Sequence, residues 1–103
     1  MMICKSLKEK KKQSIPYNQF LRSGTAIGAL IREAEFAQSK ADFINKMSIA
    51  LKEANETYYW LNLLNKTGDI DNLTYMPASK MVTEIICMLV ATIKTAKNNG
   101  LLK

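Results

Sequence analysis

The stretch that most constrains the fold of this chain is residues 39–65, whose pattern predicts one long amphipathic helix. Ser39 is a favourable N-cap, and Asp42 three residues later completes an S-x-x-D capping box, which gives amide donors of the first turn local acceptors. Gly68 lies at the C′ position after a basic last turn, so the helix is expected to end near residue 66. Apolar residues recur at intervals of three and four and share one face: Phe43, Met47, Ala50, Ala54, Tyr58 and Leu61, flanked by Ile44, Leu51 and Leu64.

A second helix is predicted over residues 17–35. Ser14 followed by Pro16 marks its start, because proline is tolerated in a first turn, where its missing N–H costs nothing. Gly24 and Gly28 lie inside this helix, and two interior glycines cost about 2 kcal/mol relative to alanine. We expect close approach of another helix backbone to offset this cost; a phosphate-binding loop is disfavoured because the GK[ST] ending is missing. The apolar stripe is Phe20, Gly24, Ile27, Ile31 and Ala34.

A third helix is predicted over residues 74–97, after a turn in which Asp71 or Asn72 is the N-cap. Pro77 is expected to kink this helix or to restart it, and residues 98–100 are expected to end it. About two-thirds of its circumference is apolar. The most apolar run is about 13 residues long, against the roughly 20 that a membrane-spanning helix requires. We therefore interpret it as a core helix and expect no membrane segment.

These three helices, with no predicted strand, indicate an all-α fold, an antiparallel up-and-down helical bundle. The 103 residues have room for one small domain, expected at residues 14–103, preceded by a basic N-terminal arm or truncated first helix at residues 1–13. A chain of this size that is 48% hydrophobic has either a dense core or a surface meant for partners.

The positive charge is concentrated at the two ends of the chain. Of the formal net charge of +6, residues 1–12 carry +4, residues 94–103 carry +3 and residues 13–93 carry −1. Such a cationic arm neutralises phosphates whatever the base sequence, which favours non-specific binding of RNA or DNA. The alternative is that the lysines only keep an apolar bundle soluble. The candidate nucleic-acid-binding residues are Lys5, Lys8, Lys10, Lys11, Lys12, Arg22 and Arg32.

Neither a catalytic nor a metal-binding signature is present in the sequence. There is no histidine, and the two cysteines, Cys4 and Cys87, have neither CxxC spacing nor a base within a motif. We therefore expect no enzymatic activity, no cofactor and no metal. Because no stretch has the apolar region of a signal peptide and two cysteines give no disulfide framework, we expect a cytoplasmic protein.

One aromatic cluster, Tyr58, Tyr59 and Trp60, lies in the central helix. Since Tyr58 belongs to the buried stripe, Tyr59 or Trp60 must face another helix, a neighbouring subunit or solvent. Exposed aromatic rings among cations would offer a stacking platform for single strands. Burial is the more common outcome for a tryptophan.

Four short runs carry a resemblance to a known family: LRSGTAIGA at 21–29, EA at 33–34, QSKADF at 38–43 and IALKEA at 49–54. In this succession the chain resembles the small four-helix-bundle proteins first known as open reading frames in 23S rRNA intervening sequences. That family includes the accessory variability determinants of diversity-generating retroelements. The resemblance covers residues 14–98.

The resemblance implies an up-and-down four-helix bundle that forms ring-shaped homo-oligomers, commonly pentamers, without enzymatic activity. In the retroelement branch it also implies binding of nucleic acid and of a reverse transcriptase through basic surfaces. The chain departs from the pattern at Leu30, where an asparagine is usual, and before Ser14, where a long first helix is expected and only 13 residues stand.

A truncated first helix would leave an apolar groove open, so we expect self-association that covers it. The candidate residues for this interface or for helix packing are Gly24, Ile27, Gly28, Ile31, Trp60, Val82, Ile86 and Ile93. Two functions are compatible with these patterns: a non-catalytic oligomer associated with nucleic acid, or a structural adaptor that binds protein and has no nucleic-acid role.

Overall fold

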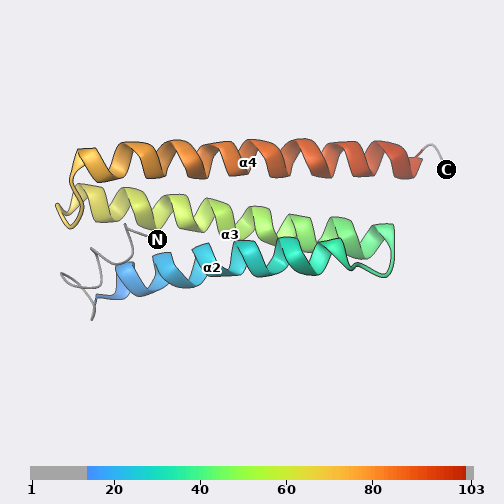
Figure 1. The fold of residues 1–103 in the computed structure, drawn as a ribbon, viewed down its shortest axis with the longest axis horizontal. Helices are drawn as coiled ribbons and strands as arrows, with labels where there is room; N and C mark the ends of the chain where they lie inside the picture. Colours follow the sequence, from blue (N-terminus) through green and yellow to red (C-terminus); the bar gives the residue numbers. More distant parts are fainter. Residues whose placement is uncertain (1–13, 102–103) are drawn as a thin grey trace.

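Three long helices make up the described part of the chain. The computed structural model describes residues 14–101, with α2 at Ile15–Glu35, α3 at Lys40–Lys66 and α4 at Asn72–Leu101. The helices lie side by side with α3 in the middle, and the chain reverses direction at both connections (Figure 1). No strand occurs within residues 14–101, which confirms the all-α class. The predicted N-terminal arm, residues 1–13, lies outside the described residues.

The helix boundaries follow from capping interactions that the sequence predicts. Ser14, Ser39 and Asp71 each accept a hydrogen bond from the backbone N–H three residues later, at 3.1, 3.0 and 3.0 Å. Such bonds satisfy amide groups that have no partner inside the helix. Gly68 follows α3 with a φ of 81°, a left-handed conformation that glycine adopts without steric cost. The predicted starts of the first two helices and the end of α3 are confirmed to within two residues.

The last helix does not restart at Pro77, and it ends later than predicted. α4 continues through Pro77 without a break. The missing N–H would have donated to the carbonyl of Leu73, a residue that is 88% exposed, so water can take the place of the lost donor. The helix also runs through Gly100 to Leu101, because glycine tolerates helical as well as left-handed backbone angles. The predicted helix end at residues 98–100 is therefore wrong.

The core consists of two clusters of buried side chains, and α3 contributes to both. Since α2 and α4 each pack extensively on α3 but hardly touch each other, α3 is the only one of the three described helices with a neighbour on either side. The first cluster contains Tyr17, Phe20, Leu61, Leu64, Ile70 and Val82. The second contains Ile27, Ala34, Met47, Ala50, Ala54, Leu89 and Ile93.

Two buried hydroxyl groups join α2 to α3. The hydroxyl oxygens of Ser23 and Thr57 lie 2.8 Å apart, and both residues are almost completely buried. Ser23 donates to the backbone carbonyl of Gln19 at 2.9 Å, so its oxygen can accept from Thr57. Because a buried hydroxyl without a partner costs free energy, this pair favours one register of α2 against α3.

Only one side of α4 is covered within the described chain. Val82, Leu89 and Ile93 face α3 and are buried. α4 is long and apolar enough to cross a membrane, but core helices of soluble proteins can be equally long and apolar. Of its most apolar 18 residues, 17% are buried within the chain. The interpretation as a core helix therefore holds for one side of α4. The large apolar residues exposed on its other sides are Leu73, Met76, Met81, Met88 and Val90.

Candidate functional site

Only two of the seven cations predicted to bind nucleic acid fall in the described part of the chain. Arg22 and Arg32 lie on α2. The other candidates lie outside the described residues: Lys5, Lys8, Lys10, Lys11 and Lys12.

Arg22 is engaged by two carboxylates of α3. Its Nη2 donates to Glu56 Oε1 at 2.9 Å, and its Nη1 lies 3.3 Å from Glu53 Oε1. Its Nε donates to the side-chain oxygen of Gln19 at 3.0 Å. A phosphate would have to compete with both carboxylates for this guanidinium, so Arg22 serves first as a contact between α2 and α3.

Near the C-terminal end of α2, Arg32 lies over the ring of Phe36, 5.9 Å from its centroid, in a cation–π contact. Glu33 accepts a hydrogen bond from Lys46 Nζ at 2.9 Å, and this contact raises the pKa of Lys46 above its usual 10.5. Because the pKa is raised in the folded chain, the contact stabilises the fold below pH 10.5 and is lost as the pH rises through the raised pKa. Its contribution is small, since both groups are accessible to water.

The residues predicted for helix packing or an oligomer interface fall into two groups. Ile27, Val82 and Ile93 are buried in the core, where contacts within the chain already use them. The others keep some or all of their surface accessible, and they are the half-buried Ile31, Trp60 and Ile86 and the exposed Gly24 and Gly28.

Gly24 and Gly28 do not touch another helix of the described chain. A Cβ atom built on either glycine would meet no atom within 4 Å outside its own helix. The expectation that another helix of the chain approaches them closely is therefore wrong for residues 14–101. Each glycine follows a residue that faces α3, Ser23 or Ile27, and so lies about 100° further around the helix.

The glycines belong to an open apolar face. Gly24 and Arg22 are separated by about 200° around α2, so the glycines lie on the side away from the ion pairs with α3. On α4, Met81 and Met88 are 56% and 48% exposed. Thr92 continues this side of α4 and shares a hollow of about 390 Å³ with Phe43 of α3. We define the open apolar face as Gly24, Gly28 and Ile31 of α2 with Met81, Ile85 and Met88 of α4.

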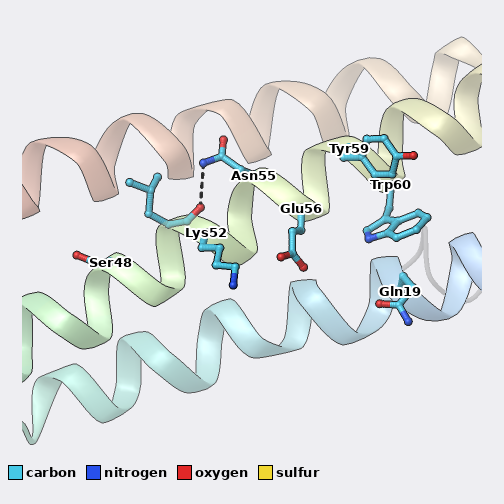
Figure 2. Close-up of a pocket in the computed structure, with 8 residues that line it drawn as sticks. Gln19, Ser48, Lys52, Asn55, Glu56, Tyr59 and Trp60 are labelled. Atoms are coloured by element: carbon cyan, nitrogen blue, oxygen red, sulfur yellow. Dashed lines mark hydrogen bonds between the residues drawn. The ribbon is translucent and has the colours of Figure 1, made fainter.

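A second surface is a hollow of about 570 Å³ on the outer side of α3 (Figure 2). Tyr59 is 58% exposed there, whereas Trp60 is half-buried and packs against the core. Their ring centroids lie 4.8 Å apart with the planes at 75°. The structure thus resolves the question that the aromatic cluster left open: Tyr59 faces solvent. The lining residues are Gln19 of α2 and Ser48, Leu51, Lys52, Asn55, Glu56, Tyr59 and Trp60 of α3.

The described acidic and thiol side chains do not gather at one site. Within residues 14–101 no three histidine, cysteine, aspartate or glutamate side chains gather closely enough to hold a metal ion. The carboxylates of Glu33, Glu53 and Glu56 pair with cations of a neighbouring helix. Cys87 is an exposed free thiol on α4.

Over residues 14–101, fold and surfaces together define an all-helical protein of three consecutive long helices, and these residues leave one apolar face open. The chain belongs to the 23S rRNA-intervening sequence protein family, whose model matches residues 1–91. It is similar to a protein of unknown function from the S23 ribosomal protein family of Bacteroides thetaiotaomicron VPI-5482. That crystal structure has a TM-score of 0.84 and 53% sequence identity to this chain, and the match covers 89% of this chain and 85% of that one. No curated protein matches the chain.

Proposed function

We propose that this protein is a non-catalytic, cytoplasmic assembly protein whose copies associate through the open apolar face and together present their basic residues to RNA or DNA. The observation that carries the proposal is the exposed apolar side of α4, which lies on a chain whose α2 carries an equally uncovered glycine face. In the assembled form, the three described helices of each chain are part of an antiparallel up-and-down four-helix bundle.

The open apolar face supports association on energetic grounds. Covering a methionine side chain fully stabilises a complex by about 1.5–3 kcal/mol, and two are half exposed on each subunit at Met81 and Met88. Gly24 and Gly28 allow a partner backbone to approach without displacing any side chain. Family membership favours a ring-shaped homo-oligomer, and we expect a pentamer. For a member of the retroelement branch, a reverse transcriptase is a further proposed partner.

A charge substitution on the open apolar face tests the association. We expect the wild-type protein to sediment as an oligomer at micromolar concentration, and the Met81→Lys, Met88→Lys variant to sediment as a folded monomer, because each new ammonium group would be desolvated at the interface. The matched control is Thr83→Lys, Val90→Lys, which adds the same charge at the same spacing on the other flank of α4.

Two outcomes of the sedimentation experiment would contradict the proposal. A wild-type protein that remains a well-folded monomer at high micromolar concentration has no such interface. If the control variant dissociates while the methionine variant assembles, the subunits associate through the other flank of α4.

Nucleic-acid binding through the terminal lysines is the second part of the proposal, and charge supports it. If each N-terminal arm neutralises about three phosphates, log K should fall with log salt with a slope on the order of −2 to −3 per arm. Replacing Lys8, Lys10, Lys11 and Lys12 by glutamine should remove most of this slope. Replacing Arg22 by glutamine should change it little, because Glu53 and Glu56 already hold that guanidinium.

Filter binding of RNA and DNA at low and at physiological salt measures both effects. If the wild-type protein and the glutamine variant bind equally, the arm is not the site. If neither binds at low salt, the adaptor function takes the place of the nucleic-acid function, and the lysines act only in solubility.

A further inference from the structure

The hollow on the outer side of α3 lies away from the open apolar face, and self-association does not account for it. Lys52, Glu56, Tyr59 and Trp60 of α3 line it on one side of the helix, with Gln19 of α2 at its edge (Figure 2). Its volume is about 570 Å³ and it is widely open to solvent, so a bound group would keep part of its surface exposed. The space is sufficient for a nucleobase with its sugar.

We infer that this hollow takes an unpaired base of single-stranded RNA or DNA, which stacks against the aromatic pair of Tyr59 and Trp60. The inference rests on the proposed nucleic-acid function and deepens it by naming the form of nucleic acid. A cationic arm attracts any phosphate backbone, whereas an aromatic site selects strands whose bases are unpaired.

The aromatic pair is placed for such a contact. Tyr59 exposes 58% of its surface and lines the hollow together with Trp60, whose ring centroid is 4.8 Å away. Every base has a π-face, so stacking on these rings requires no particular sequence. Gln19 and Asn55 also line the hollow. The Gln19 Oε1 already accepts from Arg22 and the Asn55 Nδ2 already donates to the Leu51 carbonyl, so the Gln19 amide nitrogen and the Asn55 amide oxygen are the groups left to hydrogen-bond to a base or a sugar.

The local charges also favour a base over a phosphate as the main contact. Arg22 pairs with Glu53 and Glu56, and Lys52 lines the hollow together with Glu56, so the two cations near the hollow are matched by two carboxylates. Among the described residues Lys52 has no ion-pair partner and remains able to meet one phosphate of a bound strand. The stacking contribution to affinity should therefore be nearly independent of salt, in contrast to that of the N-terminal arm.

A second copy of the chain fits this surface less well than it fits the open apolar face. Seating a helix here would remove Lys52 and Glu56 from water, and burial of charged groups opposes association. Glycines and methionines line the open apolar face instead, and none of the six residues that define it is charged. A flat ligand that leaves the charged rim hydrated avoids this cost.

Trp60 provides a direct measurement because it is the only tryptophan of the chain. The full-length protein is titrated with a 12-residue deoxythymidine oligonucleotide, with the duplex that this strand forms with its complement, and with inorganic polyphosphate. Binding is followed by fluorescence anisotropy of labelled strands, and polyphosphate by competition. We expect the single strand to quench Trp60 fluorescence in a saturable manner. Duplex and polyphosphate should quench it little, although both should bind to the lysines of the N-terminal arm.

Substitution of Tyr59 separates stacking from charge. Tyr59→Leu should weaken single-strand binding about tenfold, by the same factor at low and at physiological salt, and leave duplex binding unchanged. Tyr59→Phe should retain binding, because it keeps the ring. Phe36→Leu is the matched control, since Phe36 is an exposed ring outside the hollow. Circular dichroism and sedimentation verify that each variant folds and assembles like the wild type.

Each remaining outcome overturns the stacking site in a distinguishable way. If the oligonucleotide binds without quenching Trp60, or Tyr59→Leu binds it as tightly as the wild type, the stacking site is wrong and nucleic-acid binding by the arm stands. If no nucleic acid binds at low salt, both proposals fail. If Trp60 fluorescence changes with protein concentration alone, a second copy occupies the hollow and no base does.

Discussion

Replacing Leu61 by alanine is expected to lower the free energy of unfolding by about 3–5 kcal/mol, because the side chain leaves a cavity that the structure cannot close. Leu61 is completely buried on α3, in a cluster to which α2 contributes Tyr17 and Phe20 and α4 contributes Val82. Because α2 and α4 pack on two sides of α3, neither helix can move into the cavity at Leu61 without losing its other contacts with α3. A domain of this size has about 5–15 kcal/mol of stability, so the loss is a large part of the total.

The measurement is urea unfolding followed by circular dichroism at a fixed protein concentration, since the proposed association would couple stability to concentration. Leu73→Ala is the matched control: it removes the same atoms from a residue that is 88% exposed, and its effect should stay within about 0.5 kcal/mol. Equal shifts of the two unfolding midpoints would contradict the described core.

Replacing Gly28 by leucine is expected to abolish assembly while leaving the separate chain folded. The isolated chain tolerates the change because a Cβ at this position meets no atom within 4 Å, and leucine is a better helix former than glycine by up to about 0.8 kcal/mol. In the oligomer the same side chain would occupy the space of the partner backbone. Overpacking of this kind costs about 1–3 kcal/mol at each contact, or about 5- to 150-fold in the association constant.

Sedimentation velocity over a range of concentrations measures this effect, and circular dichroism verifies that the helix content is retained. Ala29→Leu is the control, because Ala29 is also exposed but lies 100° further around α2, away from the open apolar face. If Gly28→Leu assembles like the wild type, the glycines do not lie at a subunit interface. Their cost to the helix would then have to be offset by some other interaction.

The sequence predicts the features of the fold that depend on neighbouring residues. Ser39, Gly68 and Asp71 act through hydrogen bonds or backbone angles within a few residues, so their roles as caps can be inferred without knowledge of the packing. The predicted spacing of three and four likewise identifies the face of α3 that is buried, including Met47 and Leu61.

Features that depend on the other helices could not be inferred in the same way. Gly24 belongs to the predicted apolar stripe of α2, but a glycine has no side chain to bury, and the packing of Ser23 against Thr57 turns it away from α3. The choice between Tyr59 and Trp60 for the exposed position depends on where α2 lies, and helix periodicity does not contain that information. The sequence predicts Arg22 as a phosphate contact. Its pairing with two carboxylates could not be inferred, because both glutamates lie more than 30 residues away in the sequence.

The central position of α3 also bears on how the chain folds. Within residues 14–101 every extensive contact joins helices that are consecutive in sequence, so only short loops must close before these helices pack. Helical proteins with such local contacts fold in microseconds to milliseconds, and either the pair α2–α3 or the pair α3–α4 can form first around the shared helix. In the proposed assembly, association of complete chains is a later, bimolecular step. If the chains assemble as proposed, a newly made chain spends an interval folded but with its open apolar face uncovered, and that interval lengthens as the protein becomes scarcer.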